Sequence, residues 1–409
     1  MKVPIWPAAL ALAACGDGGF QVEGVLGAEN PADFALQTPR LTATVDGVGS
    51  GQFLIDTGAP FTILDTDSFD FDDGVQRIAL DAFMVTITDY DVVAYDALPY
   101  AMGDDRIDGI IGGDLLSEFA LALDYRDERV WLHGDWSGDV PDDLEYLGVE
   151  AVAIDVAGGG RYVVPGSCEG GCGTIDVPAT RVVVHGVMEG GERFAALVDT
   201  GATAVVVSED LLGRLGDPER PRLDGVTVGT AAGIQSAYFT RIGGVDLDDA
   251  AALASVPALV VPGWDLFEAI SDEAGEPVDA IIGGSYLRHF VATIDYPGRE
   301  LVLARYADPS HIDPREYVGP GFDIVRSAGQ WRVGDVYPGT DAAARGIDGG
   351  ELVVELGGQP IVDLDGDGVA AVIAGFDIGE PLPVTIDRLG ALVTIDVLVE
   401  DLLPEYEGP

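Results

Sequence analysis

The chain has few basic residues. Only 21 Lys and Arg stand against 71 Asp and Glu, which gives a formal net charge of −50 over 409 residues. A surface with this charge repels phosphate backbones and anionic lipid headgroups. The composition therefore excludes nucleic acid as a partner. We interpret the acidity as a means of staying soluble, and attraction of basic peptides is the alternative.

Long apolar runs are also scarce. One lies near the N-terminus, at residues 3–14, and it is too short to span a bilayer but typical of the core of a signal peptide. It ends in Leu12-Ala13-Ala14-Cys15, which resembles the bacterial lipobox. The resemblance implies a lipoprotein signal peptide at 1–15, lipid attached to Cys15 and a flexible tether at 16–30. The alternative is an ordinary signal peptide.

The lipobox resemblance also predicts where the protein resides. We expect an exported bacterial lipoprotein that meets the membrane only through its lipid anchor and faces the periplasm or the cell surface. Gly16 follows the cysteine instead of the aspartate that retains such proteins at the inner membrane, so an outer-membrane anchor is favoured.

Cysteine and histidine are rare as well. Besides Cys15, only Cys168 and Cys172 are present, and two such cysteines in an exported protein usually form a disulfide. A zinc site is the alternative, but no histidine lies near enough in the sequence to complete a ligand set. The four histidines are scattered, and none adjoins a serine or cysteine in the order of a known hydrolase. We therefore expect no metal, no cofactor and no serine or cysteine hydrolase.

Glycine and proline are abundant, at 56 and 24 residues, and the apolar runs between them are short and rich in valine and isoleucine. This pattern predicts a mainly β fold with many turns. The hydrophobic content of 47% and the mean hydropathy of +0.24 indicate a folded chain. Its length allows two or three domains.

Three blocks of sequence occur twice in the same order. Residues 53–59 (FLIDTGA) recur at 196–202 (ALVDTGA), 107–113 (IDGIIGG) at 278–284 (VDAIIGG), and 123–132 (LDYRDERVWL) at 294–303 (IDYPGRELVL). The first offset is 143 (199 − 56) and the later ones are 171 (282 − 111), so the second copy carries 28 more residues (171 − 143) between its first two blocks. The repeat predicts two copies of one domain. They occupy 31–150 and 174–308, with a glycine-rich linker at 158–173.

The repeated blocks resemble the retropepsin and pepsin clan of aspartic proteases over about residues 31–306. The signature is Asp-Thr-Gly-Ala after an apolar strand, followed by Ile-Ile-Gly and a short helix. The resemblance implies two retropepsin-like β-barrel halves that form a bilobal aspartic protease. Retroviral enzymes pair two chains, whereas this chain carries both Asp56 and Asp199, so we expect a monomer.

The chemistry explains why two copies are needed. Two nearby carboxylates cannot both ionise, so they share a proton around one water molecule. One carboxylate accepts a proton from that water, and the other polarises the substrate carbonyl. The resemblance implies that Gly58 and Gly201 donate backbone N–H groups to the catalytic Asp56 and Asp199. The alternative is that these aspartates are ordinary turn residues.

Further roles are implied by the same resemblance. Thr57 and Thr200 are expected to form hydrogen bonds across the base of the site. A flap over the substrate is expected in the second half at Gly229, Thr230 and Gly233, and in the first half within residues 83–95.

A third unit is expected at 313–403. Its segment Val318-Gly319-Pro320-Gly321-Phe322 resembles the carboxylate-binding loop of PDZ domains, and residues 333–346 resemble the run that follows in bacterial members. The resemblance implies a small α+β PDZ-like domain in which Gly319, Pro320, Gly321 and Phe322 bind a peptide carboxylate. The alternative is a small β domain that only packs against the protease. The acidic segment 363–368 is interpreted as a turn and not as a calcium loop, because Ala374 occupies the position of the required glutamate.

Together these features predict an aspartic endopeptidase that acts on peptides or unfolded proteins and carries a peptide-binding module. The alternative is a non-catalytic envelope lipoprotein that uses the retropepsin-like cleft and the PDZ groove to bind peptides.

Overall fold

The computed structural model describes residues 14–15, 19–95, 101–102, 105–134, 136, 138, 145–164, 173–230, 233–247 and 250–408. The expected disulfide between Cys168 and Cys172 falls outside this part, and of Cys15 only the backbone is included. Within these residues no helix is long and apolar enough to cross a membrane.

The first half is a closed barrel of six strands in the order β8-β6-β11-β5-β4-β7, with β7 also pairing with β8. Strands β1 and β2 extend it at one edge, and β9 and β10 form a separate pair. The strands are β1 (Ala14–Cys15), β2 (Gln21–Gly24), β4 (Arg40–Val45), β5 (Gly49–Ile55), β6 (Ile63–Asp65), β7 (Gly74–Ala82), β8 (Val85–Tyr95), β9 (Ala101–Met102), β10 (Asp105–Arg106) and β11 (Gly109–Ile111). The helices are η1 (Ala35–Gln37), α1 (Thr66–Phe69) and α2 (Gly113–Leu116).

The second half repeats this order as β23-β20-β24-β19-β18-β22, with β22 also pairing with β23 to close the barrel. Two further strands, β15 and β21, lie at the ends of its sheet. The strands are β15 (Asp155–Ala157), β18 (Arg181–Met188), β19 (Glu192–Val198), β20 (Val205–Val207), β21 (Arg222–Thr230), β22 (Gly233–Leu247), β23 (Ala250–Val260) and β24 (Ala280–Ile282). The helices are η2 (Glu189–Gly191), α3 (Glu209–Leu215), α4 (Leu266–Ala274) and α5 (Gly284–Leu287). The predicted mainly β fold is confirmed.

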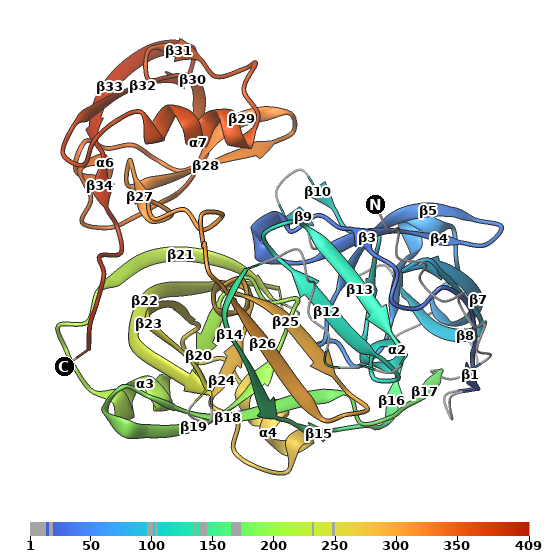
Figure 1. Cartoon of the computed structure of the whole chain (residues 1–409). Coiled ribbons are helices and arrows are strands. Elements are labelled where there is room, and N and C mark those ends of the chain that lie inside the picture. The colour runs from blue at the N-terminus through green and yellow to red at the C-terminus, as the bar shows by residue number, and fades with distance from the viewer. Residues whose placement is uncertain are drawn as a thin grey trace, which may run out of the picture.

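A six-stranded antiparallel sheet joins the halves (Figure 1). Its order is β14 (Tyr146–Ala153), β26 (Glu300–Tyr306), β25 (Phe290–Asp295), β12 (Ala120–Asp124), β13 (Arg129–His133) and β3 (Asn30–Pro31). The central strands β12 and β25 come from different halves, with Leu121 opposite Ile294. Every residue of both strands is buried, so the two halves share one hydrophobic core.

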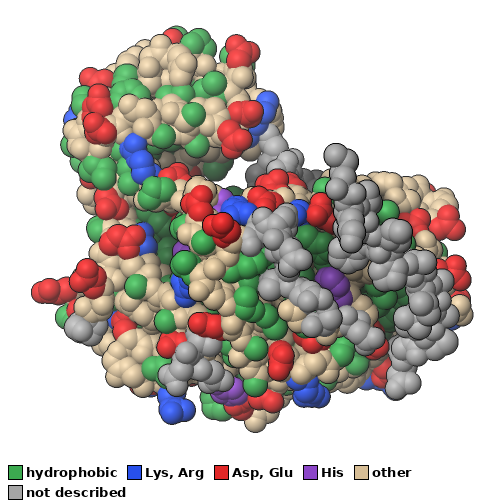
Figure 2. Space-filling view, viewed as in Figure 1, with side chains coloured by type: hydrophobic (Ala, Val, Ile, Leu, Met, Phe, Trp, Pro, Cys, Tyr) green, Lys and Arg blue, Asp and Glu red, His purple; other side chains and the backbone are tan. Residues whose placement is uncertain are grey.

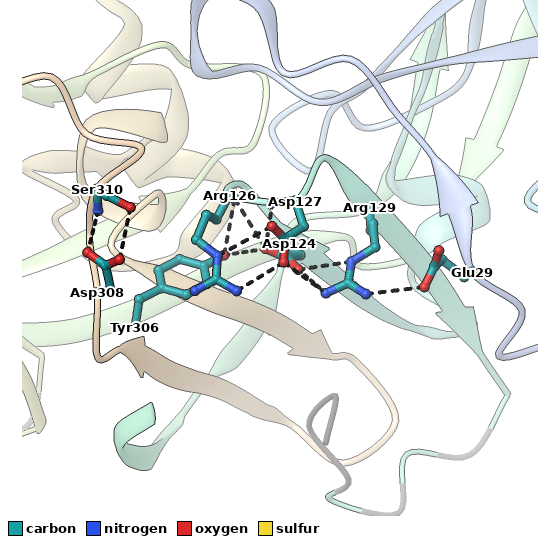
Figure 3. A network of polar contacts seen from close by, with 8 residues as sticks. All are labelled: Glu29, Asp124, Arg126, Asp127, Arg129, Tyr306, Asp308 and Ser310. Carbon is teal, nitrogen blue, oxygen red and sulfur yellow. Dashed lines mark hydrogen bonds and ion pairs between the residues drawn. The ribbon is translucent and has the colours of Figure 1, made fainter. Parts of the chain in front are cut away.

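A polar network closes the turn between β12 and β13 (Figure 3). The fully buried Asp124 accepts hydrogen bonds from the N–H groups of Arg126 and Asp127, both at 3.1 Å, and pairs with Arg129 at 2.7 Å. Tyr306, from β26 of the other half, donates to the same carboxylate at 2.7 Å. The repeated Leu/Ile-Asp-Tyr block therefore supplies a turn-closing aspartate that also ties the halves together.

One strand of a two-stranded pair lies in the expected linker, and the other begins directly after it. Strands β16 (Gly160–Val163) and β17 (Thr174–Val177) pair antiparallel, and their apolar side chains pack with Val93 of β8. The ring of Tyr162 lies 5.6 Å from that of Phe61, five residues after Asp56. This segment therefore packs on the first half, against a residue that follows Asp56 closely in the sequence.

The C-terminal unit has its own core and a sheet ordered β28-β29-β30-β32-β33, with β31 on β30. A small pair, β27 and β34, joins its two ends. The strands are β27 (Val318–Gly319), β28 (Phe322–Ser327), β29 (Gln330–Val336), β30 (Leu352–Leu356), β31 (Gln359–Pro360), β32 (Pro381–Arg388), β33 (Ala391–Leu398) and β34 (Glu400–Asp401). The helices are α6 (Asp341–Ala344) and α7 (Gly366–Ala374), and Asp365 of the acidic segment caps α7 by accepting from Gly368 N at 2.9 Å.

The C-terminal unit is docked on the second half over β21 (Figure 1). Thr227 donates its N–H and its hydroxyl to Asp335, at 2.6 and 2.9 Å, and Tyr337 packs into the apolar cluster of the second half. The chain end returns to the same half, where Leu403 is fully buried and Tyr406 donates to Asp217 at 2.5 Å. Acidic side chains are scattered over the visible face and do not gather in one patch (Figure 2).

Candidate active site

The two Asp-Thr-Gly loops begin where two apolar strands end side by side. β5 runs parallel to β11, and the N–H of Asp56 donates to Ile111 O at 3.0 Å. β19 runs parallel to β24 in the same way, and the N–H of Asp199 donates to Ile282 O at 3.0 Å. The first and second repeated blocks are therefore the two strands that hold each aspartate.

Each loop turns its backbone amides toward its own carboxylate. Gly58 N and Ala59 N donate to Asp56 Oδ1 at 2.8 and 3.0 Å. In the second half Gly201 N and Ala202 N donate to Asp199 Oδ1 at 2.8 and 3.1 Å. These bonds fix one oxygen of each carboxylate. Both aspartates remain partly exposed.

The two carboxyls meet, and they share a hydrogen bond. Each packs against the glycine of the opposite loop. A methyl group on Gly58 would overlap the carboxyl of Asp199, and one on Gly201 would overlap that of Asp56. Only glycine leaves room for this approach.

The threonines bridge the halves beneath the carboxyls. Thr57 Oγ1 accepts from Thr200 N at 3.1 Å and donates to Val198 O at 2.9 Å. Thr200 Oγ1 accepts from Thr57 N at 3.1 Å and donates to Ile55 O at 2.7 Å. Both threonines are fully buried. Four reciprocal hydrogen bonds therefore hold the two loops in one arrangement.

The electrostatics favour a proton on the pair. Burial raises the pKa of Asp56 above its ordinary value, although hydrogen bonds from Asp199, Gly58 and Ala59 oppose the shift. Burial, together with the neighbouring charge of Asp56, raises the pKa of Asp199 well above its ordinary value. The positive charge of Arg181 opposes both shifts. Two partly buried carboxyls in contact favour one shared proton.

Residues 184–286 match the family described as "Aspartyl protease". The match runs through the second half, from β18 to α5, and includes Asp199. Among the solved structures 448 chains match, and one of them is the aspartic proteinase from Irpex lacteus, at 16% identity and a TM-score of 0.41 over 69% of this chain and 98% of that one. No curated protein matches the chain.

The flap expected in the second half falls on a hairpin. β21 pairs with β22 up to Thr230 and Gly233, and Gly229 lies just before this turn. The two residues between the strands are outside the described part of the chain, as is the side chain of Thr230. The expected flap residues therefore lie at the turn of this hairpin.

The flap expected in the first half, within residues 83–95, is wrong. The β7–β8 hairpin turns at Phe83 and Met84, next to Val25, whose N–H donates to Met84 O at 3.2 Å. β7 meets β4 at Val45, which pairs with Gly49, whereas Asp56 follows the other end of β5. The turn thus lies at the end of the barrel remote from the carboxyls. Among the described residues the first half has no counterpart of β21.

The predicted carboxylate-binding residues belong to the C-terminal unit and not to the two Asp-Thr-Gly loops. Gly319, Pro320, Gly321 and Phe322 connect β27 to β28 in the C-terminal unit, and Gly321 adopts a left-handed φ of 81°. One group among the described residues, Asp155, His185 and Glu276, could hold a metal ion. Within this group His185 Nε2 and Glu276 Oε2 lie 3.1 Å apart, at hydrogen-bond distance.

A buried group behind the Asp56 loop is not among the predicted residues, and it is formed by Thr62, Tyr90 and Asp114. Asp114 directly follows Ile-Ile-Gly-Gly, and the second copy has Ser285 at that position. This difference between the copies is the signal that could have found it.

Proposed function

We propose that this protein is an aspartic endopeptidase that hydrolyses peptide bonds with a water molecule activated between Asp56 and Asp199. The observation that carries the proposal is the contact between two carboxyls, each held by two backbone amides and both joined through the threonine cross-bonds. The family match around Asp199 supports the same chemistry.

The geometry assigns each group a step. The ionised member of the pair accepts a proton from the water, whose oxygen attacks the peptide carbonyl carbon. The protonated member donates a hydrogen bond to the carbonyl oxygen and stabilises the negative charge that develops there in the tetrahedral intermediate. As the C–N bond breaks, a proton passes to the leaving amine, and the pair returns to its singly protonated state. Because amides hold one oxygen of each carboxyl, the other oxygen is available to the water and the substrate.

The test is cleavage of an unfolded protein by the purified chain from acid to neutral pH. We expect cleavage, loss of it in Asp56→Asn and in Asp199→Asn, and inhibition by a statine-containing peptide. Asp176→Asn, at an exposed ion pair with Arg161, is the matched control and should cleave normally. If the wild-type chain cleaves nothing, or if the two dyad variants remain as active as the control, the proposal fails.

A second proposal concerns the C-terminal unit, which we infer to be a PDZ-like peptide-binding module. β28 lies at the end of the sheet order and pairs only with β29 among the described strands, so its other edge can accept an extended peptide. Partly buried apolar side chains on β28 and α7, including Ile324, Val372 and Ile373, offer contacts for peptide side chains. Peptides with a free C-terminal carboxylate should bind to the chain, and the same peptides with an amidated end should not. Equal binding of both forms would contradict the PDZ mode.

We also propose that Cys15 carries a lipid anchor. In a bacterial host, the wild-type protein should partition with membranes and dissolve in detergent, whereas Cys15→Ser should be released into the soluble exported fraction. Release of both forms alike would contradict an anchor.

A further inference from the structure

The loop that follows Asp56 is held from behind by a buried carboxyl. Asp114 Oδ1 accepts hydrogen bonds from Thr62 N at 2.9 Å and from Thr62 Oγ1 at 3.0 Å. The Thr62 hydroxyl in turn accepts from Tyr90 Oη at 2.5 Å and from Gly112 N at 3.0 Å. Thr62 is six residues after Asp56, so these bonds connect the end of the catalytic loop to β8 and to the strand that holds Asp56.

The second half makes the same connection without a charge. Ser285 occupies the position of Asp114 (114 + 171), and Val205 that of Thr62 (62 + 143). Val205 N donates to Ser285 Oγ at 2.8 Å, and the serine hydroxyl donates to Pro257 O at 3.1 Å. The backbone bonds also correspond, since Asp114 N donates to Pro60 O at 3.1 Å and Ser285 N to Thr203 O at 3.0 Å. The two loops are therefore held by corresponding hydrogen bonds to one side chain, which we call the brace. The brace is ionisable in the first half, where it is Asp114, and neutral in the second, where it is Ser285.

The surroundings of Asp114 do not compensate a negative charge. The side chain is 9% exposed, and its second oxygen, Oδ2, is buried without a hydrogen-bond partner. The titratable side chain facing it is Tyr90 of β8, and burial raises the pKa of that phenol well above its ordinary value, so Tyr90 stays neutral. Thr62, the Gly112 amide between β11 and α2, and the Leu115 amide of α2 are neutral as well. Thr180, against the adjacent Gly113, adds no charge.

A carboxyl in such a site favours its protonated form. Burial outweighs the hydrogen bonds that the carboxyl accepts from Thr62 and Leu115 and raises the pKa of Asp114 to about 7. Below that pH the neutral acid still accepts the hydrogen bonds of Thr62 at Oδ1, and the brace is intact. Above it, the unpaired charge is relieved only if water enters or the carboxylate moves, and Thr62 moves with it.

We propose that Asp114 is a positioning residue that holds the first catalytic loop in its active arrangement only while its carboxyl keeps a proton. The second loop, braced by Ser285, has no such dependence. This inference deepens the proposed function, on which its catalytic consequence rests. Activity then requires two protons, one on the dyad and one on Asp114.

The test is the pH dependence of kcat/KM in the wild type and in Asp114→Asn, whose amide resembles the protonated acid and cannot ionise. Loss of the dyad proton lowers kcat/KM about tenfold per pH unit, and loss of a second required proton makes the fall about a hundredfold per unit. We expect the wild type to show the steeper fall above about pH 7, where Asp114 ionises. Asp114→Asn lacks this second step, so its fall per pH unit there should be about tenfold smaller than that of the wild type. An equally steep fall in both proteins overturns the inference.

Ser285→Ala is the matched control, because it removes the neutral brace of the second loop without removing a titrating group. It should lower kcat at all pH values and keep the steep fall of the wild type. If Ser285→Ala also loses the steep fall, loop bracing in general and not the proton on Asp114 causes it, and the proposal fails.

A measurement that does not depend on activity separates this inference from the proposed function. In the Asp56→Asn/Asp199→Asn protein the dyad does not titrate, so the backbone amide signals of Thr62 and Gly58 report on Asp114 alone by nuclear magnetic resonance. We expect both signals to shift together with a midpoint near pH 7. No shift, or a shift of Thr62 without Gly58, overturns the inference. If the wild-type chain cleaves no substrate, the proposed function fails while this titration still decides the role of Asp114.

Discussion

Replacing Thr57 with valine tests the hydrogen bonds that connect the two Asp-Thr-Gly loops. The substitution keeps the shape of the side chain and removes only the hydroxyl. Thr57 is fully buried, and its oxygen makes two hydrogen bonds with the opposite half, one accepted from Thr200 N and one donated to Val198 O. Both partners belong to the backbone and lie beneath the carboxyls, where water has no access.

The expected loss of stability follows from the groups left without partners. A buried donor or acceptor that loses its hydrogen bond costs about 1–3 kcal/mol, so two of them cost about 2–6 kcal/mol. Single domains are stable by only about 5–15 kcal/mol. Thr57→Val should therefore remove a large fraction of the free energy of unfolding, and Thr200→Val should do the same because its bonds are reciprocal.

The assay is urea unfolding followed by tryptophan fluorescence, in which the transition midpoint should fall. Thr42→Val on the exposed face of β4 is the matched control. It loses one hydrogen bond, from Gln52 Nε2 at 3.0 Å, in contact with water, and should change stability by less than about 0.5 kcal/mol. If Thr57→Val shifts the midpoint no more than Thr42→Val, the cross-bonds do not hold the halves together and the reasoning is refuted.

Three further predictions concern the dyad and its support. Gly58→Ala should abolish cleavage with little change in circular dichroism, because the added methyl group overlaps Asp199. The control is Gly213→Ala in α3, where the added methyl group has no neighbour within 4 Å and should leave the stability of the fold unchanged or slightly higher. Arg129→Leu leaves the fully buried Asp124 carboxylate without its cation and should destabilise by about 3–5 kcal/mol, measured by urea unfolding. Burial raises the pKa of Asp199 in the folded protein above its value in the unfolded chain, which is near 4. The stability that the bound proton provides is therefore present below the unfolded pKa and is lost as pH rises through the folded pKa. In thermal unfolding across pH, Asp199→Asn should be more stable than the wild type at neutral pH and equal to it in acid.

The sequence predicts the centre of the site because its parts are local and doubled. Asp-Thr-Gly occupies three consecutive residues, and the apolar runs before Asp56 and at 109–111 lie beside each other in the structure, as do their copies. Periodicity and the repeat are enough to predict strands there. The hydrogen bonds between the Thr57 and Thr200 loops can be predicted as well, because they require only that the two copies face each other.

The parts that sequence reasoning missed depend on register and on distant contacts. Whether the turn at Phe83 lies near Asp56 or at the far end of the barrel is decided by the pairing of β7 with β4, which alternation of side chains does not reveal. The hydrogen bonds at Asp114 join residues 62, 90 and 114, which are far apart in the sequence and belong to no shared motif. Docking of the C-terminal unit rests on Asp335 and Tyr337, which are ordinary residues at the end of a strand.

The pattern of symmetry in the structure has a chemical reason. Symmetry is kept where both halves must do the same thing, namely hold a carboxylate, donate two amides and cross-bond through a threonine. The two halves differ around the loops. Strand β21 has no described counterpart in the first half, and its Thr227 donates a hydrogen bond to the C-terminal unit. A dyad needs two equivalent carboxyls, whereas a peptide substrate has direction and meets the two halves with different side chains. The asymmetric surroundings are therefore where we expect substrate selection to be encoded.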